Sequence, residues 1–501
     1  LEDLLAFKIG GPACVYVVTT RFPQIAMQFA TDEVIALEEL NEGQSMALLS
    51  QMLPYLAQDE PEALNGLVHA VGGLPLALTL MGRYLLTQTH SHQPRRARAA
   101  LERLCDAETR LKLSVPQALL GRSPALPAQS PVSLQTVIAV SNQQLDEEAR
   151  RVLQALPVFP PKPDTFSEEA ALAVAATTEE TLDALSDAGL LEGRAGRYTL
   201  HQTIADYARS ALFDSAPYQR FIAYFVSYIE KHQRDYDALD RERTKLLTAL
   251  DTAFTHHQCA ELMRGLKHGY AFLEARGLYE LAEHYLRLVE HCWESADAST
   301  RGQMRFMSGR IAELRNDLAR AQICYEEALQ LARESGITRD IGVLLAVQGA
   351  CNVRIGNYEQ AEEKLQEALS IARWTQDSAI LIRVLGSRGA MANERGNFAE
   401  GEAYLIEALE LIRQTGQQES LFQILNNLCS STAEQGKYGQ AEGYQLEFVE
   451  LARQLGHREK LCGSLCNLGA LYSFQQKYEQ AKRTLEEALS IAHQLDHGEW
   501  T

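Results

Sequence analysis

The sequence lacks the features that mark membrane and secreted proteins. In its 501 residues no apolar run approaches the roughly 20 residues that a membrane-spanning helix needs. No basic segment followed by an apolar segment stands at the start, so no signal peptide is recognisable. We therefore expect a cytoplasmic protein without membrane association. The first residue is Leu1 rather than methionine, and we expect the sequence to be part of a longer protein.

Catalytic and metal-binding patterns are also lacking. The sequence contains no Gly-x-x-x-x-Gly-Lys-Ser/Thr phosphate loop, no apolar strand ending in paired acids, and no Ser/His/Asp, Cys/His or paired-carboxylate set. The nine cysteines are scattered, and only Cys462 and Cys466 lie close together, with His457 nearby. No second pair stands at zinc spacing. We predict no catalytic and no metal-binding residues, and interpret the cysteines as small core residues in a reducing compartment.

Positive charge is scarce. The formal net charge is −19, and so acidic a chain repels phosphate backbones. The densest basic run, Arg95-Arg96-Ala97-Arg98, is short and is interpreted as solvated helix surface. Direct nucleic-acid binding by this chain is therefore not expected.

The second half of the chain repeats itself every 40 residues. An apolar or aromatic residue follows a polar corner at positions 318, 358, 398, 438 and 478, and a weaker copy begins at Gly277. The preceding segment of each copy carries a small residue at a constant phase: Gly309, Gly349, Gly389, Cys429 and Gly469. Small residues let two helices approach closely, and a corner glycine can take a positive φ. Each copy is thus predicted to be a helix pair that must stack on its neighbours to bury its apolar face.

This pattern resembles the tetratricopeptide repeat family, whose common period is 34 residues. The resemblance covers 261–501 and implies an α-solenoid, with each helix about one turn longer than usual. The first helix of each pair is expected to line a concave groove that takes a protein or peptide ligand. Six polar residues on these helices are the predicted groove residues: Arg354, Arg388, Asn393, Asn426, Asn427 and Asn467.

The front of the chain predicts a remnant of an α/β domain followed by helices. Residues 13–21 read as a buried strand that ends at Arg21, and 34–37 as a second short strand. A helix over 41–53 is capped by Asn41, another spans 60–71, and Pro75 opens the next.

The ordered pair Val18-Thr19-Thr20-Arg21 and Gly73-Leu74-Pro75-Leu76 resembles the NB-ARC family of signalling ATPases, a branch of the signal-transduction ATPases with numerous domains (STAND). The resemblance implies that Arg21 contacts the terminal phosphate of a bound nucleotide. It also implies that Gly73, Leu74, Pro75 and Leu76 form a turn whose proline packs on the adenine. The phosphate loop and the magnesium-binding acids of that family precede Arg21. We therefore expect the chain to begin inside its nucleotide domain and to be unable to hydrolyse ATP as it stands.

Residues 131–215 predict a winged helix, with helices over 134–142, 147–156, 167–175, 179–188 and 202–212 and a hairpin that turns at 193–196. Over 133–215 there are thirteen acidic residues and six basic ones, which argues against DNA binding. In the NB-ARC family a Met-His-Asp motif follows the wing, and its histidine contacts the β-phosphate of ADP. Here Leu200-His201-Gln202 aligns with it, so His201 matches and Gln202 replaces the acid.

The predicted fold is mainly α. Its parts are the nucleotide-domain remnant (1–38), a helical domain (39–130), the winged helix (131–215), a helical linker (216–260) and the repeat solenoid (261–501). The leading hypothesis is the regulatory arm of a signalling ATPase, with ADP or ATP as cofactor, Mg²⁺ in the full protein and homo-oligomerisation on activation. Two alternatives stay open. One is a transcriptional regulator with its DNA-binding domain outside this chain, and the other is a plain interaction scaffold.

Overall fold

The computed structural model describes residues 26–27, 34–35, 37, 39–89, 94–115, 132–210, 214–416 and 420–498. The chain divides into two compact units, and each is described by itself. Unit 1 comprises Leu1–Phe225 and Glu242–Thr252, and unit 2 comprises Val226–Arg241 and Ala253–Thr501. The predicted strand over 13–21 and the predicted end of that strand, Arg21, lie outside the described residues.

The first part of unit 1 is a cluster of short helices. They are α3 (Glu42–Met52), α4 (Pro54–Asp59), α5 (Pro61–Ala70), α6 (Pro75–Thr89), α7 (Pro94–Leu104) and α8 (Ala107–Lys112). The predicted cap is confirmed: the Asn41 side chain accepts from the Gln44 amide at 2.9 Å, and the Gln44 side chain accepts from the Asn41 amide at 3.1 Å. Prolines at the starts of α4, α5 and α6 begin each helix where no amide donor is needed.

Two expectations in this region are settled by the structure. The predicted strand over 34–37 is wrong for its described residues, because Val34, Ile35 and Leu37 lie in no strand and are exposed. A strand needs a partner for its backbone groups, and none pairs with these three. The basic run on α7 is solvated helix surface as expected: Arg95 and Arg96 are exposed, and Arg98 pairs with Glu60 at 2.7 Å.

The rest of unit 1 combines helices with short antiparallel strands. The elements are β1 (Ser114–Val115), β2 (Val132–Ser133), α10 (Leu134–Gln143), α11 (Glu147–Ala155), η1 (Leu156–Val158), β3 (Phe166–Ser167), α12 (Glu168–Ala175), α13 (Glu179–Asp187), β4 (Glu192–Arg194), β5 (Arg197–Thr199) and α14 (Gln202–Arg209). The predicted hairpin is confirmed as β4 paired with β5, with Gly193 opposite Tyr198. Strand β3 was not predicted; it pairs with the other edge of β5, and its Phe166 stacks on Phe159 with ring centroids 4.1 Å apart.

Three helices follow, α15 (Ala216–Lys231), α16 (Tyr236–Arg241) and α17 (Arg243–Thr255). The chain passes between the units within α15, between α16 and α17, and again within α17. In unit 1, buried Glu242 accepts from Arg197 at 2.8 Å and lies 3.2 Å from Lys245. A buried carboxylate with two cationic partners is adequately compensated for its loss of hydration. This network fixes the start of α17 against the hairpin.

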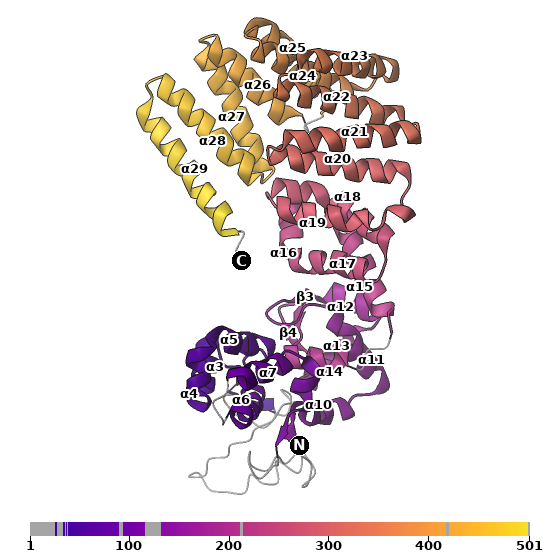
Figure 1. The fold of residues 1–501 in the computed structure, drawn as a ribbon, viewed down its shortest axis with the longest axis vertical. Helices are drawn as coiled ribbons and strands as arrows, with labels where there is room; N and C mark the ends of the chain where they lie inside the picture. Colours follow the sequence, from indigo (N-terminus) through magenta and orange to yellow (C-terminus); the bar gives the residue numbers. More distant parts are fainter. Residues whose placement is uncertain are drawn as a thin grey trace. The chain divides into compact units, whose positions relative to one another are not determined.

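Unit 2 is an array of helix pairs, stacked in chain order in Figure 1 from α18 to α29. Its helices after α16 and α17 are α18 (Cys259–Ala275), α19 (Tyr279–Glu290), η2 (Trp293–Ser295), α20 (Ala298–Leu314), α21 (Leu318–Ser335), α22 (Thr338–Ile355), α23 (Tyr358–Thr375), α24 (Ser378–Glu394), α25 (Phe398–Thr415), α26 (Leu421–Glu434), α27 (Tyr438–Gln454), α28 (Arg458–Phe474) and α29 (Tyr478–Gly498). The 40-residue period is thus confirmed as a succession of helix pairs.

The small residues form the contact between the two helices of a pair. A Cβ added at Gly349 would lie 2.6 Å from Leu365, and one added at Gly389 would lie 2.5 Å from Leu405. Leu365 and Leu405 are fully buried, so neither can move aside cheaply. The recurring glycine therefore sets how closely each pair packs. We call this contact the glycine seam.

The corners and turn aromatics behave as the sequence predicts. Gly356 and Gly396 end α22 and α24 with φ values of 85° and 79°. Tyr358, the first residue of α23, packs against Met391 of the following pair and lies beneath the Arg395 guanidinium, whose carbon is 4.9 Å from the ring centroid. The aromatic thus joins one pair to the next.

One expectation about the cysteines is wrong. Cys259 of α18 and Cys292 after α19 are joined in a disulfide. We expected free thiols because the two cysteines are far apart in the sequence. Distance along the sequence does not show whether two side chains are close in the folded chain. Among the described residues, no helix combines the length and apolar character that a membrane span requires.

Replacing a seam glycine should destabilise the array. Gly389→Val places methyl groups against Leu405, and overpacking of this kind costs about 1–3 kcal/mol. The matched control is Gly443→Val on α27, where an added Cβ meets nothing within 4 Å. Thermal unfolding followed by circular dichroism should show a lower Tm for Gly389→Val and little change for Gly443→Val. Equal Tm values for the two variants would contradict the role assigned to the seam.

Candidate functional site

In unit 1 the structure brings the glycine turn before α6 against His201. A Cβ added at Gly72 would lie only 3.0 Å from His201 Nε2, and Gly72 has a φ of 56°. Gly73 has a φ of 72°, and a Cβ there would meet the Leu40 carbonyl oxygen at 2.1 Å. Because Gly72 has no side chain, its bare backbone faces the imidazole, while Gly73 packs its backbone against Leu40.

The orientation of His201 follows from its contacts. Its Nδ1 accepts a hydrogen bond from the Thr203 amide at 3.2 Å, so the neutral ring carries its proton on Nε2. The side chain is 7% exposed, and Nε2 faces the Gly72 backbone and the Glu39 carboxylate, with Glu39 Oε1 3.9 Å away. Burial lowers the pKa of His201 below its usual value. The result is a neutral, buried imidazole whose Nε2–H faces the backbone of the glycine turn.

An acidic residue stands beside this donor. Glu39 Oε1 lies 3.9 Å from His201 Nε2, and both Glu39 oxygens accept from Lys162 Nζ at 3.0 Å. Burial opposes ionisation of Glu39, but the Lys162 ammonium outweighs it and holds the carboxyl pKa below its usual value. Lys162 also contacts Glu192 of β4 at 3.1 Å. The position next to His201 therefore already attracts an anionic group.

The remaining nucleotide candidates lie around this cluster. Gly73 is buried, Leu74 and Leu76 are half-buried, and Pro75 is exposed at the start of α6. Gln202 has a different partner from His201. It donates to Asp206 at 2.9 Å instead, while Arg110 donates to the other oxygen of the same carboxylate at 3.0 Å. The predicted turn and His201 are thus brought together, whereas Arg21 lies outside the described residues.

Unit 2 contains a groove of about 1710 Å³. Its walls come mainly from the first helices of the pairs, α18, α20, α22, α24, α26 and α28, with further residues from the start of α16 and the end of α27. This volume exceeds the roughly 300–1,000 Å³ of a pocket for a small molecule. The space suits a peptide segment.

The charge of this groove is opposite to that of the chain. Nine Lys and Arg residues line it against four Asp and Glu residues. The basic residues are Arg234, Lys267, Arg276, Arg310, Arg339, Arg354, Arg383, Arg453 and Lys460, and the acidic ones are Asp235, Asp237, Glu274 and Glu313. A positively charged recess in a chain of net charge −19 concentrates anions locally.

Three of the six predicted groove residues line the groove, namely Arg354, Asn426 and Asn467. The other three, Arg388, Asn393 and Asn427, do not. Arg388 donates to Glu362 and Gln366 of the preceding pair at 2.6 and 2.8 Å. Asn393 donates to the Asn427 carbonyl at 3.2 Å, which ties α24 to α26. Asn393 lies one helical turn after Gly389, so it shares the face of the glycine seam rather than the groove face.

The two ends of the array meet at one side of the groove. Arg276, after α18, donates to the Gly456 carbonyl at 2.8 Å and to Asp237 at 2.6 Å. The Tyr279 hydroxyl bonds to the Glu459 carboxylate, and the His457 ring contacts Tyr236 with centroids 5.9 Å apart. Repeats separated by 180 residues thus contact each other directly. We call these contacts the end-to-end contact.

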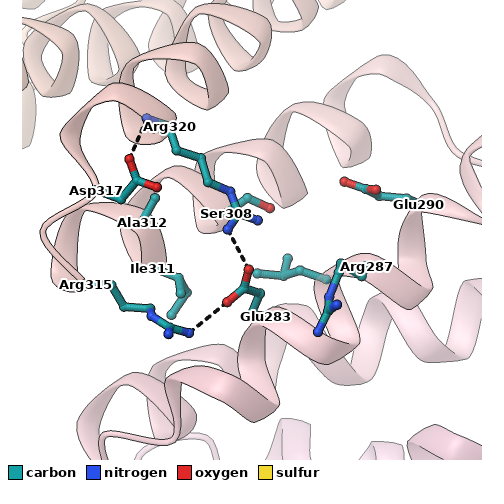
Figure 2. Close-up of a pocket in the computed structure, with 10 residues that line it drawn as sticks. Glu283, Arg287, Glu290, Ser308, Ile311, Ala312, Arg315, Asp317 and Arg320 are labelled. Atoms are coloured by element: carbon teal, nitrogen blue, oxygen red, sulfur yellow. Dashed lines mark hydrogen bonds and ion pairs between the residues drawn. The ribbon is translucent and has the colours of Figure 1, made fainter.

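A second, smaller cleft is a structural ion network. Figure 2 shows Glu283 between Arg315 and Arg320, at 3.0 and 2.6 Å. The cleft has a volume of about 190 Å³. Its central acid is already paired with two guanidinium groups, Arg315 at the end of α20 and Arg320 on α21, which link both to α19. Over the described residues, no group of three or more His, Cys, Asp or Glu side chains is arranged to hold a metal ion.

Comparison with protein families assigns the C-terminal part of the chain. The tetratricopeptide repeat model matches residues 420–494, which contain α26 to α29. These residues are tetratricopeptide repeats. The recurrence of the same helix pair and glycine seam before residue 420 carries this architecture through unit 2. No curated protein sequence matches the chain.

Solved structures show the same fold over most of the chain. A signal-transduction ATPase with numerous domains from Pyrococcus horikoshii, with a tetratricopeptide repeat sensor, superposes with a TM-score of 0.50 at 16% identity. The match covers 92% of this chain and 61% of that one, so the chain spans less than two thirds of its length. At this identity the likeness establishes a shared fold.

Two further matches are more partial. A Rap protein complexed with competence and sporulation factor has a TM-score of 0.43 at 12% identity, covering 55% of this chain and 77% of that one. Aspartyl phosphate phosphatase F from Bacillus subtilis has a TM-score of 0.43 at 9% identity, covering 72% of this chain and 88% of that one. Superpositions this loose support no conclusion about the present chain.

The predicted site residues did not include Lys460, Arg310 and Arg276 in the groove, or Glu39 and Lys162 beside His201. The sequence does contain a signal for the basic groove. The first helices α20, α22, α24, α26 and α28 hold nine basic and five acidic residues, whereas their partners α21, α23, α25, α27 and α29 hold eight and eighteen. Summing charge over the whole chain conceals this separation. Glu39 and Lys162 gave no signal, because they are 123 residues apart in the sequence.

Acid should weaken the end-to-end contact through His457. Burial, and then the charge of Lys460, lower the pKa of His457 to about 4, with Glu274 acting in the opposite direction and Arg276 in the same one. Since the folded pKa lies below the usual value of about 6.5, His457 contributes stability above pH ~6.5 that is lost as the pH falls toward 4.

The Tm of the wild type should therefore fall more steeply between about pH 7 and pH 5 than that of His457→Gln, which has no titrating group there. The control is His493→Gln at an exposed position of α29, which should follow the wild type. Parallel Tm curves for wild type and His457→Gln would show that His457 is not held neutral by the fold.

Proposed function

We propose that this chain is the regulatory and sensor portion of a STAND-type signal-transduction ATPase of the NB-ARC kind. In this proposal unit 1 responds to bound ADP or ATP, and the groove of unit 2 binds a protein or peptide ligand. The observation that supports the nucleotide part is the approach of His201 to Gly72, in the turn that precedes α6. The observation that supports ligand binding is the groove of unit 2. The protein would act in the cytoplasm.

The residues present fit a phosphate group. His201 offers a buried Nε2–H at the glycine turn, and a neutral imidazole donor suits a phosphate oxygen. Gly72 places no side chain against it. In the proposal His201 holds the β-phosphate of ADP, the turn over Gly73 to Leu76 holds the adenine against Pro75, and Arg21 reaches the terminal phosphate of ATP. The negative charge of the bound nucleotide, with or without the terminal phosphate, distinguishes the ATP-bound state from the ADP-bound state.

Glu39 sets a second requirement for phosphate binding at His201, because its carboxylate must be displaced. Its carboxylate lies 3.9 Å from His201 Nε2 and is held by Lys162. An incoming phosphate competes with Glu39 for His201, since two anions this close repel each other. Lys162, which bonds both Glu39 and Glu192, can retain the displaced carboxylate. Nucleotide binding would then change the contacts between the start of α3 and strand β4.

The chain would work as a switch through differential affinity. A ligand in the groove shifts the nucleotide state only if it binds one conformation better than the other, and the nucleotide then alters ligand affinity by the same factor. In this proposal the unit formed by 131–215 is a winged helix that transmits the change, and activation leads to homo-oligomerisation. Mg²⁺ would be held by residues of the full protein.

Two rival functions make different use of the same parts. A plain interaction scaffold needs the groove but binds no nucleotide. A transcriptional regulator would need a DNA-binding domain elsewhere, because α13 carries Glu179, Glu180, Asp183 and Asp187 and faces phosphate with the wrong sign. Nucleotide content separates the leading proposal from the scaffold.

The test is the nucleotide released from the full-length protein. We expect ADP on denaturation of the wild type. His201→Ala should weaken ADP binding by about tenfold, as loss of one hydrogen bond to a charged group implies. His493→Ala, at an exposed site on α29, is the matched control and should retain ADP.

Chromatography of the released material and titration with a fluorescent ADP analogue give the two readouts. A full-length protein that carries no nucleotide and binds none would contradict the switch and leave the scaffold.

A further inference from the structure

The first helix pair of the array, α18 with α19, lacks the contact that joins most of the others. Gly269 of α18 stands 40 residues before Gly309, at the position that forms the glycine seam in later pairs. A Cβ added at Gly309 would lie 2.5 Å from Tyr325 of its partner helix. Among the described residues within 4 Å, a Cβ added at Gly269 would meet only Ile229 of α15, at 3.4 Å. The first pair is therefore not joined by a glycine seam.

A disulfide joins this pair instead. Cys259 is the first residue of α18, and Cys292 follows the end of α19. A short turn at Gly277 connects the two helices at their other ends. The disulfide thus closes the end of the pair that lies opposite the turn. When the disulfide is open, the turn is the only covalent link between the two helices.

The turn of the same pair forms the end-to-end contact. Arg276 donates to the Gly456 carbonyl at 2.8 Å, and the Tyr279 hydroxyl bonds to the Glu459 carboxylate. Both contacts depend on the relative position of α18 and α19, because Arg276 follows one helix and Tyr279 begins the other. The disulfide therefore supports the contact between the two ends of the array.

The two sulfurs differ in their access to solvent. Cys259 is half-buried, whereas Cys292 is only 4% exposed. Cys259 also lies at the N-terminus of a 17-residue helix, and the side chain of the preceding residue, Gln258, does not cap that helix. The amide groups at a helix N-terminus stabilise a thiolate. Cys259 is thus the cysteine suited to react with a dissolved reagent, and Cys292 is suited to complete the exchange from inside.

We infer that Cys259 and Cys292 form a thiol–disulfide exchange site, that its reactant is a low-molecular-weight disulfide such as glutathione disulfide, and that its redox state controls the end-to-end contact. On oxidation the Cys259 thiolate attacks the small disulfide, forms a mixed disulfide and releases one small thiolate. The Cys292 thiolate then attacks the Cys259 sulfur, forms the protein disulfide and releases the second small thiolate.

This exchange is balanced in protons and electrons. The two protons that the cysteines give up convert the released thiolates into thiols. The protein loses two electrons, and the small disulfide gains them. An excess of the small thiol reverses both steps.

A reversible bond fits the compartment of the proposed function. In a reducing compartment, disulfides are usually transient or redox-sensing rather than structural. The inference rests on the proposed function for this compartment alone. It depends neither on nucleotide binding by unit 1 nor on a ligand in the groove.

The first experiment measures whether the bond exchanges in the folded protein. The full-length protein is equilibrated at several ratios of glutathione to glutathione disulfide and quenched with acid. Free thiols are then alkylated, and mass spectrometry quantifies the Cys259–Cys292 disulfide. We expect the bond to open in excess glutathione and to re-form in excess glutathione disulfide. A bond that stays closed in excess glutathione, or two thiols that do not rejoin, would overturn the inference.

The second experiment measures the consequence for the array. Hydrogen exchange with mass spectrometry compares the oxidised and reduced wild type over residues 276–286 and 456–463. Reduction should speed exchange in both segments by about tenfold or more, because opening a loop of 33 residues removes a large constraint on local unfolding. Unchanged exchange over 456–463 would show that the disulfide does not control the end-to-end contact.

Cysteine variants assign the response. Cys259→Ser should exchange like the reduced wild type in every buffer. Cys105→Ser removes an exposed free cysteine of α7 in unit 1, and this matched control should keep the full redox response. A response that persists in Cys259→Ser, or is lost in Cys105→Ser, would overturn the assignment.

The comparison of two redox states of the wild type keeps the test valid even where a variant folds poorly. The nucleotide content of the full-length protein tests the proposed switch separately.

Discussion

The close packing of a glycine against a buried leucine is the contact on which unit 2 depends. At Gly349 and Gly389 the second helix lies so near that no Cβ fits. This proximity fixes the angle within each pair, and repetition of the same angle curves the array until α18 meets the start of α28. The groove and the end-to-end contact both follow from that curvature. A locally loosened seam would therefore alter the binding surface as well as the stability.

Charge is the second constraint, and it is arranged by helix rather than by domain. Second helices carry the acids that keep the chain at −19, and first helices carry the bases that line the groove. Unit 1 uses charge differently. His201 is kept neutral by burial while Glu39 and Lys162 hold each other beside it. Both units thus contain an anion-attracting position inside a chain that repels anions as a whole.

The repeat was predictable because its signals are local. Gly389, Gly396 and Phe398 stand within ten residues, and each acts through neighbours in sequence or in the adjacent pair. Asn393 was misplaced because a polar residue was assumed to face the groove, whereas its helical phase sets it on the seam. The Arg276–Gly456 contact was not predictable, since it depends on curvature summed over 180 residues. The turn at Gly73 and His201 was anticipated by resemblance, while Glu39 depends on a partner 123 residues away.

The central claim is that the groove and the nucleotide cradle belong to one switch. The most direct measurement is the Kd of a fluorescent ADP analogue for the full-length protein, with and without a saturating groove-binding peptide, together with the Kd of the peptide with and without ADP. The account predicts that the peptide changes the ADP affinity by about fivefold or more, and that ADP changes the peptide affinity by the same factor. A protein that binds both, with neither affinity affected by the other, would contradict the account.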